Sequence, residues 1–107
     1  GANPPVHYED GQHEKYLINR ARKAGEKDDE TMREVAIRAA IQLGCDSVVE
    51  LLIEDLSASS EHMRVLAYGG MRAILADSPP DYDPQAHPEN SKADATRVAA
   101  WARSRLR

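Results

Sequence analysis

The residues of this chain that could do chemistry are few and scattered. Its four histidines stand at positions 7, 13, 62 and 87, and no spacing among them would bring two onto one metal ion. Cys45 is the single cysteine, so no intrachain disulfide can form. Since free cysteine packs as a small hydrophobe, Cys45 is expected to be buried rather than to act as a nucleophile.

Acidic residues gather in one proline-rich segment. Asp81 and Asp83, together with Glu89, could offer oxygens to a hard cation. Calcium, however, needs about six to eight oxygens in a shaped loop, so we interpret these acids as solvated turn residues. No motif pairs a nucleophile with a base, cradles a phosphate or places two catalytic carboxylates together. The sequence therefore predicts no catalytic, cofactor-binding or metal-binding residue.

Composition narrows the class of protein. The chain has 107 residues, 41% hydrophobic and 30% charged, which suits one globular domain. Its 14 basic and 18 acidic residues give a net charge of −4, so nucleic acid is not an expected partner. No apolar run approaches the roughly 18 residues of a membrane span. The sequence does not fix the cellular compartment. It slightly favours the cytoplasm, and a mature exported protein is the alternative.

Helical periodicity shows which elements must position these residues. We predict an extended arm over residues 1–12, then a helical domain over 13–107. The expected helices span 13–24, 30–43, 45–57, 60–76 and 91–106. Expected N-caps are Asp28 or Asp29, Ser47 with Glu50, a serine of the 57–60 turn, and Ser91 with Asp94, and Gly44 is expected to end the second helix. Residues 77–90 hold four prolines and form a loop.

The chain also repeats itself. Glu30-Thr31-Met32-Arg33 recurs as Glu61-His62-Met63-Arg64 at an offset of 31, and a weaker copy starts at Arg97, at a further offset of 33. With small residues following in the second helices, the pattern resembles the HEAT-repeat family of the short bacterial type. That resemblance implies an all-α fold, a short α-solenoid of stacked antiparallel helix pairs with about two and a half repeats. It also implies that the repeated arginines brace neighbouring repeats.

The same offsets place certain residues in equivalent positions. Ile37 corresponds to Tyr68 and then to Trp101, and we predict that the three form a partner-binding strip on successive second helices. Burial of this strip under the loop is the alternative. Gly70 takes the place of Ala39, where helices approach closely. Gly69 takes the place of the exposed Arg38, so it either tolerates exposure or marks a point where a partner or the loop lies against the backbone.

We therefore expect a non-catalytic protein-interaction or scaffolding module, with a protein partner and an open question of self-association. Two alternatives remain: an enzyme or enzyme subunit of HEAT-like fold, lyase-like or DNA-repair-like, with Asp77, Asp81 and Tyr82 as its best candidates, and a structural fragment of a longer solenoid. The loop is expected to fold back as a cap, anchored by Tyr82, over the side of the fourth helix that bears Val65, Leu66 and Tyr68.

Overall fold

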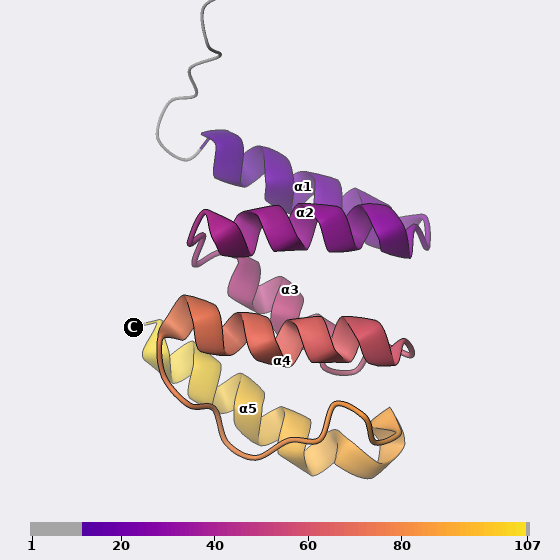
Figure 1. Ribbon diagram of the computed structural model, residues 1–107, viewed down its shortest axis with the longest axis vertical. Coiled ribbons are helices and arrows are strands. Elements are labelled where there is room, and N and C mark those ends of the chain that lie inside the picture. Colours follow the sequence, from indigo (N-terminus) through magenta and orange to yellow (C-terminus); the bar gives the residue numbers. More distant parts are fainter. Residues whose placement is uncertain (1–11, 107) are drawn as a thin grey trace, which may run out of the picture.

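The helices follow the periodicity of the sequence, and each expected helix forms (Figure 1). The computed structural model describes residues 12–106, and within that range it is all-helical, as predicted. The helices are α1 (Gln12–Glu26), α2 (Glu30–Gln42), α3 (Val48–Asp55), α4 (Glu61–Leu75), a 3₁₀ turn (Pro88–Ser91) and α5 (Lys92–Arg105). The expected arm lies outside the described residues, except Gln12, which begins α1.

Two of the expected N-caps form and two do not. The side chain of Asp29 accepts a hydrogen bond from the Met32 amide, and Ser60 accepts one from the Met63 amide. Gly44 ends the second helix with a φ of +71°, which favours glycine. Ser47, however, has helical backbone angles, and its hydroxyl donates to Glu14 of α1 instead of capping. Ser91 precedes α5 without a side-chain cap bond.

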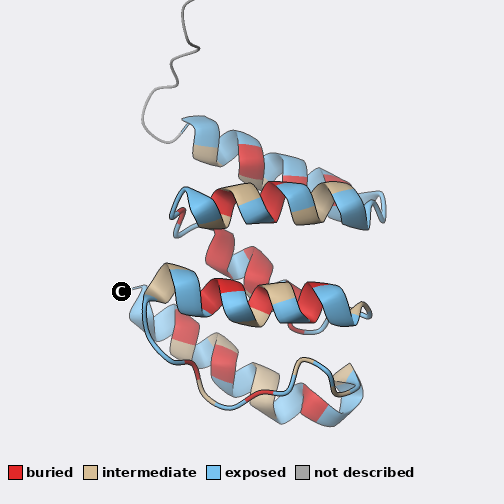
Figure 2. Ribbon diagram, in the orientation of Figure 1, coloured by how far each residue is buried: buried red, intermediate tan, exposed pale blue. Residues whose placement is uncertain are grey.

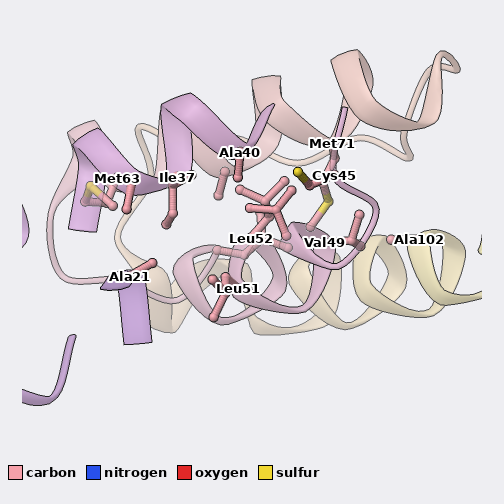
Figure 3. Close-up of a cluster of buried hydrophobic side chains, with 14 of the residues drawn as sticks. Ala21, Ile37, Ala40, Cys45, Val49, Leu51, Leu52, Met63, Met71 and Ala102 are labelled. Atoms are coloured by element: carbon pink, nitrogen blue, oxygen red, sulfur yellow. The ribbon is translucent and has the colours of Figure 1, made fainter. Parts of the chain in front are cut away.

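The helices form two layers around one core. Helices α2 and α4 lie side by side in one layer, while α1, α3 and α5 form the other (Figure 1). The central helix α3 is the most buried, as its apolar sequence predicts (Figure 2). Its Leu52 points into the space between the layers, where the buried side chains of Ile37 from α2 and Met71 from α4 also lie (Figure 3). Burying these aliphatic side chains supplies the main driving force for folding.

The last helix departs from the arrangement that the repeat predicted. Offset arithmetic placed α5 beside α4, in the layer of the second helices, but α5 lies beside α3 in the other layer. Residues 77–90 instead occupy the space beside α4 (Figure 1). Prolines prevent these residues from forming a full helix, and the ion pair of Arg103 with Glu50 of α3 helps to hold α5 in its layer.

The close approach of α2 and α4 explains one of the two adjacent glycines of α4. A Cβ built on Gly70 would lie 2.7 Å from Ile41 Cδ1 of α2 and 3.2 Å from Leu52 Cδ1 of α3. A Cβ built on Gly69 meets nothing within 4 Å. The small residue at position 70 is therefore a packing requirement, while position 69 is open to solvent.

This difference predicts opposite effects of substituting the two glycines. We expect Gly70→Leu to lower the free energy of unfolding by about 1–3 kcal/mol, because its side chain would displace Ile41 and Leu52. Gly69→Ala should raise it by up to about 1 kcal/mol through helix propensity. Thermal melts of the two variants provide the measurement. A loss of stability in Gly69→Ala would contradict the open surroundings of that residue.

Candidate interaction surface

A groove runs between α2 and α4 on the outer side of their layer. It has a volume of about 320 Å³ and is lined by Arg38, Ile41, His62, Val65, Leu66, Gly69, Gly70 and Ala73. The apolar side chains of Ile41 and Leu66 are only partly buried there, and Val65 is 47% exposed. Because neither Gly69 nor Gly70 has a side chain, the α4 wall of the groove stays low along its middle. We call this feature the α2–α4 groove.

Charged side chains bridge the groove at one end. Glu34 of α2 forms an ion pair with Arg38 at 3.0 Å and a hydrogen-bonded contact with His62 Nε2 of α4. The contact with His62, followed by the one with Arg38, lowers the pKa of the Glu34 carboxyl below its ordinary value. At neutral pH Glu34 is therefore ionised. An acidic and a basic side chain thus stand beside an apolar floor.

The structure separates the residues expected to form one binding strip. Ile37 has no exposed surface, so the prediction that it lies on a surface strip is wrong; α2 is covered by helices on both sides, and Ile37 belongs to the core. Tyr68 is half-buried by the loop, with its hydroxyl donating to the Pro80 carbonyl at 2.8 Å. Trp101 lies in the opposite layer, where the Arg105 guanidinium sits 5.7 Å from its ring centroid.

Gly69 is the one member of the predicted site that lies in the α2–α4 groove. Val65 and Leu66 also line this groove, whereas they were expected to lie under the loop. Of the residues expected under the loop, Tyr68 does lie there, on the other side of α4, and the loop also covers Arg64. Ile41 and Arg38 were missed as site residues, and a helical projection of α2 against α4 would have found them beside Leu66 and Gly69.

Two of the three repeated arginines brace the fold as the resemblance implied. Arg33 of α2 reaches α3 through Asp55 and Glu54 and reaches α1 through the Ala21 carbonyl. Arg64 of α4 donates to three carbonyl oxygens, those of Ala58, Ser59 and Pro84 in the loop. Arg97 differs, since it is exposed and pairs with Asp94 of its own helix. The expected bracing role is therefore wrong for Arg97, just as the expected layer is wrong for α5, the helix that carries it.

A larger hollow of about 670 Å³ opens at the α1–α2 and α3–α4 turns. Its charged lining consists of Arg22, Glu26, Asp28, Asp29, Glu30, Arg33, Glu54 and Asp55. Several of these groups already have structural partners: Asp29 caps α2, Glu30 accepts a hydrogen bond from the Ser60 hydroxyl, and Asp55 holds Arg33. Glu30, Glu54 and Asp55 thus join the two helix pairs, while Asp29 serves its own helix.

The other residues that could take part in chemistry are also buried in the fold or bonded to other parts of it. Cys45 is buried, and burial followed by the charges of Glu14 and Asp46 raises the pKa of its thiol, which lowers its reactivity at neutral pH. The Tyr82 hydroxyl is buried and donates to the Leu56 carbonyl, while Asp77 pairs with Arg105 at 3.0 Å. Among residues 12–106, no cluster of three or more histidine, cysteine or acidic side chains is arranged to hold a metal ion.

Comparison of the chain with protein-family models, with curated proteins and with solved structures finds no match in any of the three. None of the helices in the described part of the chain is long and apolar enough to cross a membrane. The α2–α4 groove, with its exposed Val65 and Gly69, remains the apolar hollow in the described part of the chain whose lining, apart from His62, is not taken up by ion pairs between helices.

Proposed function

We propose that this chain is a non-catalytic protein-interaction module built from HEAT-like helix pairs, with the α2–α4 groove as its binding surface. The observation that carries the proposal is the row of incompletely buried apolar groups in the groove, from Ile41 and Leu66 to the 47% exposed Val65. Apolar surface that a small domain leaves open beside charged groups is typical of sites that bind another protein.

The shape of the groove supports a helical or extended protein segment as the ligand. Two parallel ridges, α2 and α4, enclose an apolar floor, and such a trough accepts side chains spaced along one face of a helix. The ion-paired Glu34 and Arg38 at its edge can orient the segment by charge. Exposed Val35 of α2, with 57% of its surface accessible, extends the apolar area beyond the groove.

Filling the groove tests the proposal. Ala73 lines the groove and Ala100 lies on the exposed side of α5, so leucine at either position adds the same side chain to an exposed helical site. We expect Ala73→Leu to remove the proteins that crosslink to the wild-type chain in its native extract, while Ala100→Leu retains them. Quantitative mass spectrometry of crosslinked material gives the readout. Equal recovery with both variants would exclude the groove as the binding surface.

A further inference from the structure

Helix α4 presents a regular ridge to solvent at the side of the groove. Glu61, Val65, Gly69 and Arg72 follow one another at spacings of four, four and three residues, so they lie on one face of the helix. All four are exposed. Val65 forms a projection, and Gly69, with nothing within 4 Å of an added Cβ, forms an open notch. The ridge begins with an acid and ends with a base.

This ridge is complementary to itself when a second copy runs in the opposite direction. Along the helix, the midpoint between Glu61 and Arg72 falls between residues 66 and 67. The midpoint between Val65 and Gly69 falls at residue 67, so the two midpoints nearly coincide. A two-fold axis at this point therefore brings Glu61 of each copy to Arg72 of the other, and Val65 of each copy into the other's Gly69 notch. Self-complementarity of this kind is what an isologous interface requires.

The two charged residues of the ridge are available for such a contact. Within residues 12–106, neither Glu61 nor Arg72 forms an ion pair. The order of their charges also suits the dipole of α4. The dipole does not explain why an exposed, helix-weakening glycine stands one turn from an exposed valine, whereas a valine projection facing a glycine notch explains both.

Helix α2 carries the same polarity at the same level. Its Glu34 and Arg38 are centred on residue 36, which the offset of 31 residues places level with residue 67 of α4. Consider a two-fold axis that runs parallel to the α2–α4 layer and perpendicular to the helices. Such an axis pairs α4 with the α4 of the second copy, and it also pairs α2 with the α2 of the second copy. Arg38 of one copy then approaches Glu34 of the other, near the exposed Val35. The same two-fold axis thus brings opposite charges together on both α2 and α4.

We propose that the partner that binds over the α2–α4 groove and the adjoining ridge of α4 is a second copy of this chain. The two copies form a two-fold dimer whose centre is an antiparallel α4–α4 contact. The inference rests on the proposed interaction function and deepens it by naming the partner. Antiparallel pairing satisfies both charges at each end of the ridge and covers Val65 in both copies. A parallel pairing would instead place Glu61 beside Glu61 and Arg72 beside Arg72.

Sedimentation equilibrium on the purified full chain, over a range of concentrations, tests the dimer. We expect the wild-type chain to reach twice the monomer mass. Gly69→Leu fills the notch from an exposed position where an added Cβ meets nothing within 4 Å, so it should weaken association at least about tenfold, while the melting temperature of the monomer, measured at low concentration, does not fall. Glu61→Arg should weaken association by about tenfold, and Glu61→Arg with Arg72→Glu should restore it. Glu26→Arg, an equal charge change on exposed α1, should have no effect.

Three results would overturn the dimer: a monomeric wild-type chain at every concentration, undiminished association of Gly69→Leu, or a double charge exchange that fails to restore what the single change removed. The proposed function fails separately. A monomeric chain whose crosslinked proteins are lost in Ala73→Leu keeps the groove as a surface for a different protein. A monomeric chain with unchanged recovery in Ala73→Leu loses both the dimer and the interaction surface.

Discussion

We expect Arg33→Leu to lower the free energy of unfolding by about 3–5 kcal/mol, because it leaves the buried Asp55 carboxylate without its cation. Only 8% of the Asp55 surface is exposed, and Arg33 Nη2 lies 3.0 Å from its Oδ1. The same guanidinium bonds the Ala21 carbonyl at 3.2 Å, so three helices lose a common contact. Urea denaturation at neutral pH measures the loss.

The loss of folding stability caused by Arg33→Leu should grow as the pH rises. Burial raises the pKa of Asp55 above its ordinary value of 3.8, and Arg33 opposes that rise. Without Arg33 the folded-state pKa rises further above the unfolded value. A raised folded-state pKa means that stability is greatest while the carboxyl is protonated and falls as pH rises through that pKa. The variant should therefore approach the wild type at acid pH and fall furthest behind at neutral pH.

Two controls separate the charge from the lost packing. Arg33→Leu combined with Asp55→Leu should recover most of the stability, since removing both charges leaves no ion unpaired. Arg97→Leu, at the equivalent position of the third copy, should change stability by less than about 0.5 kcal/mol because its partner Asp94 is local and the side chain is exposed. If Arg97→Leu costs as much as Arg33→Leu, the assignment of bracing roles is incorrect.

Tyr82→Ala is the second change with a large expected effect, about 3–5 kcal/mol of lost stability. Tyr82 is 7% exposed, its ring centroid lies 5.3 Å from that of Tyr68, and its hydroxyl donates to the Leu56 carbonyl. It is thus the side chain that joins residues 77–90 to the core. Hydrogen exchange should show faster exchange along α4 and in this loop, because Tyr68 and Arg64 lose their cover.

Tyr82→Phe serves as the matched control. It keeps the ring and its contact with Tyr68 but removes the hydroxyl, so we expect a smaller loss of about 1 kcal/mol. Replacing residues 79–88 with a Gly-Ser linker should lower the melting temperature as Tyr82→Ala does and expose apolar surface to self-association. An unchanged melting temperature in the linker variant would show that residues 79–88 are not a structural cap.

Several features of the fold were predictable because their causes are local in the chain. Asp29 and Ser60 cap helices through amides three residues away, and Gly44 ends a helix through its own backbone angle. The burial of Tyr82 was also predictable, since a proline-rich segment with one aromatic residue has a single candidate anchor. Ser47 has the same local pattern but does not cap, because its backbone has helical angles, φ −65° and ψ −16°, instead of the extended angles of Ser60.

The candidate site was predicted less well than the fold. Sequence offset treats Ile37, Tyr68 and Trp101 as equivalent, but the exposure of a side chain depends on what covers its helix. Helix α2 has neighbours on both sides, which buries Ile37 completely. Tyr68 is covered by an extended segment, and Trp101 lies in the other layer. Of the predicted residues, Gly69 alone lies in the groove that the structure reveals.

The sequence by itself determined which segments are helical, their approximate ranges and some of their caps, because hydrogen bonds and caps act within about four residues along the chain. It also determined the need for a small residue at Gly70, through the offset from Ala39. Only the tertiary structure decided that α5 lies beside α3, and that α2 and α4 leave a groove open between them. Those outcomes depend on which non-local surfaces bury the most apolar area together, and no short stretch of sequence encodes that competition.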